Sequence, residues 1–165
     1  MSIDFTKPEC QDDSNAKLFG LCDDKPGERA YLDEVNGANW IAVVMNNNRY
    51  QVTFTGIDKC VIKDNEEKGR GRCDGSLSYN STIVFIELKK SNELGNKWVV
   101  GGEEQLRSTI SFFKENEYSE QFKQKRAYIC NSEHPKFKES QQRRMEQFLA
   151  DTGYVLRIEN RIMLQ

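Results

Sequence analysis

The middle of the chain carries the hydrophobic pattern of β-strands. Residues 50–62 are rich in β-branched and aromatic side chains, and residues 72–79 alternate between apolar and polar positions. Residues 83–86 form a continuous apolar run, which predicts a central strand that is buried on both faces. Asn80 and Ser81 predict a tight turn between the last two segments. We therefore expect three consecutive strands.

Apolar residues at helical spacing bracket these strands. They predict a helix over residues 28–44 and a second helix over residues 103–113. Residues 126–130 predict a strand, residues 138–150 a third helix and residues 154–158 a last strand. The expected order is helix, three strands, helix, strand, with an added C-terminal helix and strand. This order predicts an α/β fold in which a central mixed β-sheet is flanked by helices.

The N-terminal part of the chain has a different composition. Residues 1–27 are polar and rich in aspartate, and they contain Pro8 and Pro26. We expect them to form a loosely structured arm. The remaining residues, 28–165, are long enough to bury a core of their own, so we expect a single domain there.

Apolar runs and cysteines limit where the protein acts. The longest apolar run, Ile41 to Met45, is too short to span a bilayer, and acidic residues interrupt the segment that follows Met1. We therefore expect no membrane association and a cytoplasmic location. The five cysteines are odd in number and lack CxxC spacing, so we expect buried free thiols and no disulfide framework.

The histidine content and the distribution of charged residues limit the kinds of catalytic site that the chain can form. His134 is the only histidine, which excludes sites built from several histidines. The net charge of −2 is unevenly distributed, because residues 1–87 carry 10 Lys and Arg against 15 Asp and Glu. Residues 88–165 are correspondingly basic. This distribution fits a protein that holds a metal with its acidic half and phosphates with its basic half. It fits an ordinary solvated surface about equally well.

Two carboxylates and an ammonium group are expected to converge at one point. Glu87 and Lys89 are two residues apart in the predicted central strand, so they share one face of it. A hairpin through the turn that precedes this strand brings Asp74 alongside Glu87. Two carboxylates a few ångströms apart repel unless a cation lies between them. Hard oxygen ligands, with the backbone carbonyl of Leu88 among them, select Mg²⁺ or Mn²⁺.

The segment from Asp74 to Glu87-Leu88-Lys89 resembles the motif of the PD-(D/E)xK nuclease superfamily, which has the restriction-endonuclease-like fold. The expected order of elements over residues 28–130 is similar to the core of that superfamily. The resemblance implies that Asp74 and Glu87 hold the metal, with Leu88 as a carbonyl ligand, and that Lys89 is the catalytic lysine. Many members add a glutamine in the following helix, where Gln105 lies in the expected first turn. Many also place a glutamate in the first helix, for which Glu34 is the best candidate.

The resemblance implies a Mg²⁺- or Mn²⁺-dependent phosphodiesterase, in particular a DNA endonuclease of bacterial defence or mobile elements. So small a chain leaves little room for a separate specificity domain, so we expect selectivity from a homodimer, a partner subunit or DNA structure. Arg72 and Cys73 stand where the motif has its proline. The alternative is a non-catalytic binding or assembly subunit with the same fold, which the acidic isoelectric point also fits.

Overall fold

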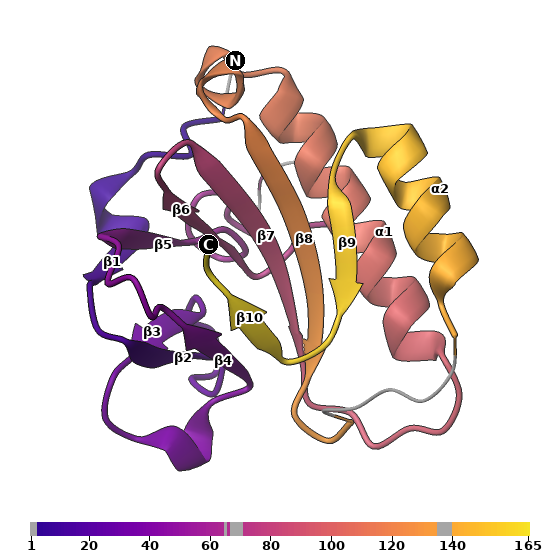
Figure 1. The fold of residues 1–165 in the computed structure, drawn as a ribbon, viewed down its shortest axis with the longest axis horizontal. Helices are drawn as coiled ribbons and strands as arrows, with labels where there is room; N and C mark the ends of the chain where they lie inside the picture. Colours follow the sequence, from indigo (N-terminus) through magenta and orange to yellow (C-terminus); the bar gives the residue numbers. More distant parts are fainter. Residues whose placement is uncertain (1–2, 65, 67–70, 135–139) are drawn as a thin grey trace.

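The computed structural model describes residues 3–64, 66, 71–134 and 140–165. Its main element is a six-stranded sheet with the strand order β1-β5-β6-β7-β8-β9 (Figure 1). The bounds are β1 Gln11–Ser14, β5 Val52–Gly56, β6 Gly75–Tyr79, β7 Thr82–Lys89, β8 Gln124–Asn131 and β9 Val155–Ile158. Strands β1, β5, β6 and β7 pair antiparallel, whereas β7, β8 and β9 pair parallel. The expected α/β fold with a mixed sheet is confirmed.

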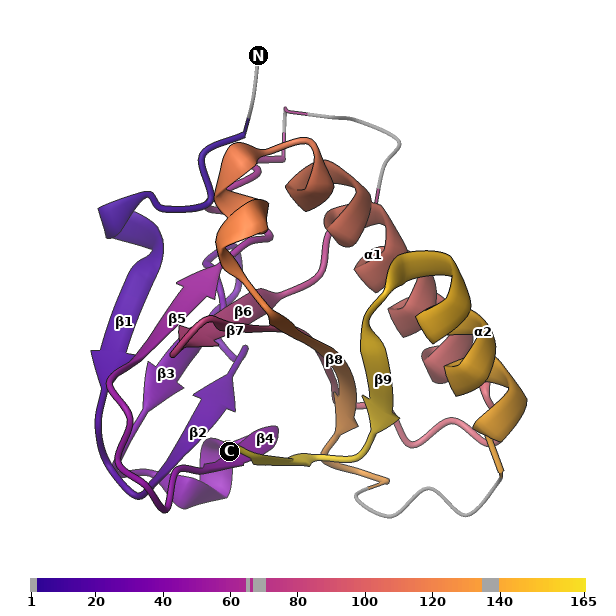
Figure 2. The ribbon, with the colours of Figure 1, turned by 45° about the horizontal axis from the view of Figure 1, so that its top comes forward.

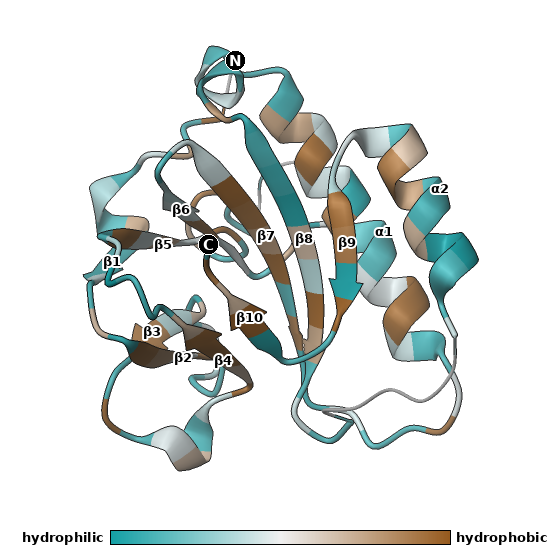
Figure 3. Ribbon diagram, in the orientation of Figure 1, coloured by the Kyte–Doolittle hydropathy of each residue, from teal (hydrophilic) through white to brown (hydrophobic). Residues whose placement is uncertain are grey.

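Strand β7 is buried on both faces, as its apolar run predicts. Much of this strand is coloured as hydrophobic in Figure 3. Ile83 and Phe85 pack in one hydrophobic cluster, and Val84 and Ile86 pack in the other. Because side chains alternate along a strand, Glu87 points to the same face as Phe85.

Two long helices cover the Phe85 face of the sheet (Figures 1 and 2). Helix α1 (Lys97–Lys114) connects β7 to β8, and helix α2 (Gln142–Thr152) connects β8 to β9. Leu106, Ile110 and Phe113 of α1 contribute to the cluster on this face. Gly153 ends α2 in the left-handed conformation that favours glycine, with φ of 81°.

A second sheet covers the other face of β7 and β8. It has the order β10-β4-β2-β3, with β2 at Leu18–Cys22, β3 at Tyr31–Asp33, β4 at Ala42–Met45 and β10 at Arg161–Met163. Phe19 and Val44 of this sheet share a hydrophobic cluster with Val84, Ile86 and Tyr128 of the larger sheet. One continuous core therefore joins the two sheets.

Two expectations for the N-terminal third are wrong. Residues 28–44 form no helix; they form β3, the short 3-10 helix η2 (Gly37–Asn39) and β4. Residues 1–27 are also not a loose arm, because they contribute β1, β2 and the 3-10 helix η1 (Pro8–Cys10). Short strands with one buried face can have apolar residues at a spacing that also suits a helix. In this segment, packing against the rest of the protein favours strands over a helix.

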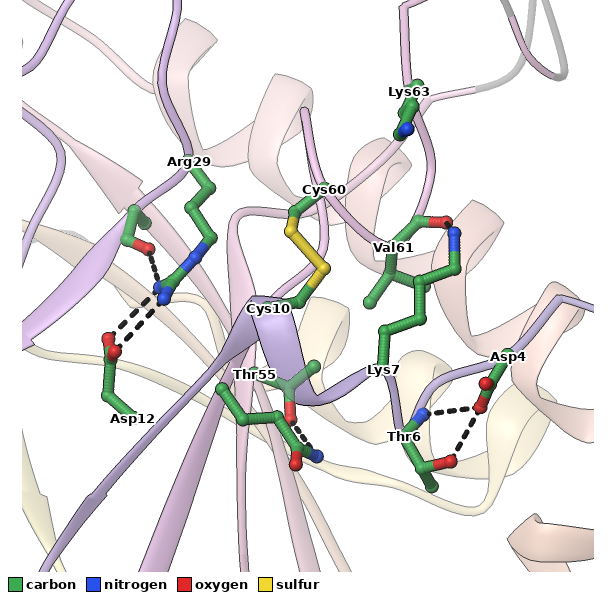
Figure 4. The surroundings of a disulfide bond; sticks show 12 residues. Asp4, Thr6, Lys7, Cys10, Asp12, Arg29, Thr55, Cys60, Val61 and Lys63 are labelled. Atoms are coloured by element: carbon green, nitrogen blue, oxygen red, sulfur yellow. Dashed lines mark hydrogen bonds and ion pairs between the residues drawn. A yellow bond between two sulfur atoms is a disulfide. The ribbon is translucent and has the colours of Figure 1, made fainter.

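The expectation of free thiols is wrong for one pair of cysteines. Cys10 and Cys60 form a disulfide, with their Cα atoms 5.7 Å apart, and it ties η1 to the loop between β5 and β6 (Figure 4). Lys7 also donates a hydrogen bond to the carbonyl of Val61 beside it. The other cysteines, Cys22, Cys73 and Cys130, are free and buried. The two bonded residues are 50 positions apart in the chain, so sequence spacing carries no signal of the pair.

The remaining elements keep their expected order with shifted bounds. Helix α1 begins at Lys97, six residues before the expected start at Glu103, and β5 covers only part of the expected segment over 50–62. Helix α2 begins at Gln142, and the expected start at 138 lies outside the described residues. Among the residues that the structure describes, no helix is long and apolar enough to cross a membrane. The 3-10 helix η3 (Glu117–Gln121) leads from α1 into β8.

Candidate active site

The site lies where β6 begins beside the last residues of β7. The pairing of these strands starts with Gly75 opposite Ile86, so beyond Ile86 the edge of β7 has no strand partner on this side. The carboxylate of Asp74 occupies that edge and accepts a hydrogen bond of 2.7 Å from the Leu88 backbone N–H. In a strand the N–H and C=O of one residue point the same way. The Leu88 carbonyl therefore faces the Asp74 side, as a backbone ligand at this place must.

Glu87 and Lys89 point from β7 toward helix α1. The Lys89 Nζ atom lies 3.1 Å from Glu87 Oε2 and donates a hydrogen bond of 3.2 Å to Gln105 Oε1. Gly101, one turn before Gln105, faces the Lys89 ammonium: an added Cβ there would lie 4.0 Å from Nζ, at ordinary contact distance. The predicted group of Asp74, Glu87, Lys89 and Gln105 is thus brought together in space.

Gln105 reaches this group from a different position in its helix than expected. Because α1 begins at Lys97, Gln105 lies in its third turn, not its first. Gly71 packs against Gln105, where an added Cβ would lie 3.3 Å from Gln105 Cγ. The buried Thr109 hydroxyl accepts a hydrogen bond from the Cys73 N–H and donates one to the Gln105 carbonyl. Helix α1 therefore holds both the glutamine and the segment that carries Asp74.

The loop between β5 and β6 fixes Asp74 from the other side. The Ile57 N–H donates to the Asp74 carbonyl at 3.0 Å, and the Asp58 N–H donates to the Cys73 carbonyl at 3.2 Å. Arg72 forms an ion pair of 3.5 Å with Asp58. These contacts set the backbone of Asp74, so the position of its carboxylate depends on the sheet and on α1 together.

Glu87 is a buried carboxyl without a full set of partners. It is 3% exposed, it pairs with Lys89 through Oε2, and its carboxyl interacts with the Asp74 side chain. Among the described residues, no N–H or O–H donates to its Oε1 atom. Burial, followed by the charge of Asp74, raises the pKa of Glu87 well above its usual range. Burial likewise raises the pKa of Asp74 to about 7, while the Leu88 N–H opposes that shift. Burial therefore opposes ionisation of both carboxyls when no cation accompanies them.

Two further acids extend this site, and sequence reasoning missed both. Asp23 follows β2 of the smaller sheet and interacts with the Asp74 side chain. Desolvation raises the pKa of Asp23, and Lys59 opposes the shift. Desolvation also raises the pKa of Asp58, which Arg72 opposes. Neither acid belongs to a motif, so only the fold could reveal that these acids approach Asp74.

Glu34, the predicted fourth metal ligand, lies elsewhere. It follows β3 and accepts a hydrogen bond of 2.6 Å from the Ser14 hydroxyl. Ser14 pairs with Val52, whereas Gly56 at the other end of β5 pairs with Gly75, the neighbour of Asp74. Val52 and Gly56 are four residue steps apart along the strand, about 13 Å. The assignment failed because it depended on the expected first helix, which does not form.

The residues at the site fit a hard divalent cation in their chemistry. Asp74 and Glu87 offer carboxylate oxygens, and Leu88 offers a carbonyl oxygen. Glu87 Oε1 receives no hydrogen bond among the described residues, so its lone pairs are available to a cation. Two side-chain carboxylates are the core of this set: within the described ranges, no group of three or more His, Cys, Asp or Glu is arranged to hold a metal ion. Comparison with protein-family models, with curated proteins and with solved structures finds no match to this chain.

Proposed function

We propose that the protein is a metal-dependent nuclease of the PD-(D/E)xK type that hydrolyses phosphodiester bonds. The observation that carries the proposal is the convergence on Lys89, whose ammonium lies 3.1 Å from Glu87 and 3.2 Å from Gln105, beside Asp74. A hairpin, a strand end and a helix each contribute to this group. Within the pair of Lys89 and Glu87, Glu87 is buried whereas the Lys89 side chain is 24% exposed, so a desolvated carboxyl lies beside a cation that a substrate can reach.

The order of elements supports the same family. Strands β5, β6 and β7, helix α1 and strand β8 follow the order of three strands, helix and strand that the superfamily core has. The antiparallel β5-β6-β7 part and the parallel β7-β8 pair fit the α/β sheet expected for it. The first helix of that core has no counterpart before β5, and we propose that the smaller sheet takes its place as a cover of the core.

Each side chain has a distinct task in the proposed reaction. Asp74 and Glu87 are the residues that would hold Mg²⁺ or Mn²⁺, with the Leu88 carbonyl as a further oxygen. The cation would supply charge to the scissile phosphate and acidify a water molecule. Lys89 orients the attacking water and stabilises negative charge that builds on the phosphate. Gln105 orients the Lys89 ammonium through their hydrogen bond.

DNA is the proposed substrate and an endonuclease the proposed type, with a homodimer or a partner subunit providing selectivity. A cytoplasmic location remains part of the proposal. The Cys10–Cys60 disulfide is of a kind that reducing compartments rarely maintain, so it makes that location testable. Alkylation of the cysteines during cell lysis, before non-reducing electrophoresis, would show whether the bond exists in cells.

The test of the activity uses supercoiled plasmid. We expect the protein to nick or linearise it with Mg²⁺ or Mn²⁺ and to leave it intact in EDTA. Ca²⁺ should permit binding with little cleavage, because it is a larger ion with a looser ligand shell. The matched control is Asp74→Asn, which keeps the size of the side chain and removes its charge. Full cleavage by that variant, or by the wild type in EDTA, would contradict the proposal.

A non-catalytic assembly subunit is the second candidate. The net charge of −2 supports it, because the chain is not basic enough to argue nucleic-acid binding from charge. A wild-type protein that binds nucleic acid or a protein subunit, and that cleaves no plasmid with any divalent cation, would favour this reading.

A further inference from the structure

A cavity of about 560 Å³ opens beside the candidate active site, between the two sheets. One wall comes from the smaller sheet and includes Asp23, Asn39 and Trp40. The other wall follows the ends of β7 and β8 and includes Lys90 and Ser132. Asp23 lines this cavity and also interacts with Asp74, so the cavity borders the site. Its volume lies within the range of small-ligand sites.

Trp40 is the aromatic surface of this cavity, and its ring is held in a fixed place. Its Nε1–H donates a hydrogen bond of 2.8 Å to Asp33, and the same carboxylate accepts from the N–H of Asn36. A Cβ at Gly20 would lie 1.9 Å from the Trp40 ring, so the ring packs directly on the backbone of β2. A ring fixed in this way can stack on a ligand with little loss of conformational entropy.

The opposite wall is equally well ordered. The Asn131 side chain accepts hydrogen bonds from the N–H groups of Ser91 and Glu133 and donates one to the Ser91 carbonyl. This clamp joins the loops that follow β7 and β8. It places the Ser132 hydroxyl, which is buried and has no partner among the described residues, next to the cavity. The clamp fixes the backbone of this wall, so a ligand in the cavity meets a preformed surface.

The charges on the cavity select the kind of ligand. Among the described residues, Asp23, Asp24 and Glu133 line it against one cation, Lys90. Such a lining repels a phosphate but accepts hydrogen bonds from amino groups, as carboxylates do at the N4 of cytosine. An aromatic wall, carboxylate acceptors and a neighbouring phosphodiester-cleaving site together fit a nucleobase.

We propose that this cavity binds one unpaired nucleobase of the substrate, stacked on Trp40, next to the phosphate that is cleaved. The inference rests on the proposed nuclease function and adds a strand preference to it. A base inside a duplex cannot enter a pocket without leaving its stack, which costs free energy. The protein should therefore prefer single-stranded or locally unpaired nucleic acid to an intact duplex.

The test fills the cavity without removing a contact. Ala38 lines the cavity and is exposed, so Ala38→Phe should fill it while the fold is kept. Val35 lies in the same loop outside the cavity, and Val35→Phe is the matched control. We expect Ala38→Phe to weaken binding of a single-stranded oligonucleotide about tenfold, within the contribution of one stacked base. Val35→Phe should change it less than twofold.

Tryptophan fluorescence supplies a readout that is independent of cleavage. A single-stranded oligonucleotide added in Ca²⁺ should quench the wild type, and the quenching should be lost in Trp40→Phe, whose remaining tryptophan, Trp98, is buried. If Ala38→Phe binds and cuts as the wild type does, or if duplex binds more tightly than single strands, the pocket is refuted while the nuclease stands. If no divalent cation supports cleavage but Trp40 is still quenched and Ala38→Phe still weakens binding, the nuclease proposal fails and the base pocket survives.

Discussion

The two sheets of this protein bury apolar side chains against each other, but their strands differ in length and in burial. The larger sheet contains β7 and β8, each eight residues long, and β7 is apolar along most of its length. The smaller sheet contains strands of three to five residues, and several of them are only partly buried. The long strands place the reactive groups. The short ones cover the core and bring Asp23 to its edge.

This difference shows which strands can be predicted from the amino-acid sequence. A strand buried on both faces needs apolar residues in succession, which no amphipathic helix supplies over so short a run. A short strand with one covered face needs only an apolar residue here and there. Its identity depends on the surface that it meets. We therefore expect the strands of the smaller sheet to form only when they pack on the larger sheet. The following predictions test that dependence.

The largest expected effect concerns the two hydrophobic clusters, one on each face of the larger sheet. Phe85 and Phe19 are both fully buried, one in the larger sheet and one in the smaller. Each substitution to alanine should lower the free energy of unfolding by about 3–5 kcal/mol. Because one cluster joins the sheets, urea unfolding followed by circular dichroism should stay a single transition for Phe19→Ala. Two separate transitions would show that the smaller sheet is an independent unit.

The disulfide should have a similar effect on stability. Cys10 and Cys60 enclose a loop of 50 residues, and cross-linking a loop of this length is worth about 4 kcal/mol. Reduction should therefore lower the melting temperature by roughly 10 °C. Scanning calorimetry with and without a reductant measures the change. The Cys10→Ser/Cys60→Ser double variant should melt at the lower temperature and ignore the reductant; a reductant effect in this variant would place the cause elsewhere.

The catalytic group of the larger sheet is tested by Lys89→Ala. Loss of a charge that stabilises the transition state should slow plasmid cleavage about 10²–10³-fold. Binding of nucleic acid in Ca²⁺ should change far less, because one phosphate contact among several is lost. Glu34→Ala is the control from the N-terminal third: among the described residues its carboxylate accepts a hydrogen bond from Ser14, away from the site. This variant should cut at the wild-type rate. A wild-type rate for Lys89→Ala would move the site elsewhere.

The smallest effect concerns pH. The pKa of Asp74 is raised to about 7, above the value of 3.8 in an unfolded chain. Between these two values the folded protein binds more protons than the unfolded one, so stability must fall as the pH rises. Without a divalent cation we expect a slope of at most about 1.4 kcal/mol per pH unit from this carboxyl. Urea unfolding in EDTA at pH 5 and pH 8 measures it. Asp74→Asn should flatten the slope, and an unchanged slope would assign it to other groups.

The candidate site was largely predictable because its residues are close in sequence or share a strand. Glu87 and Lys89 must lie on one face of β7, and a hairpin must bring Asp74 near them. Gln105 was found in the right helix but in the wrong turn, since the apolar residues that begin α1 at Lys97 are interrupted by Gly101 and Gly102. The assignment of Glu34 to the site was wrong because it depended on a helix over residues 28–44. The structure has strands there, which apolar residues at a similar spacing can also form.

The amino-acid sequence alone determines the mixed α/β order of β5 to β9 and the meeting of Asp74, Glu87 and Lys89. Local periodicity and a short hairpin are enough for both. Only the tertiary structure decides that residues 18–45 become strands, that Cys10 reaches Cys60, and that Asp23 and Trp40 border the site. Each of these depends on contacts between residues far apart in the chain, whose free energy exists only once the larger sheet has formed.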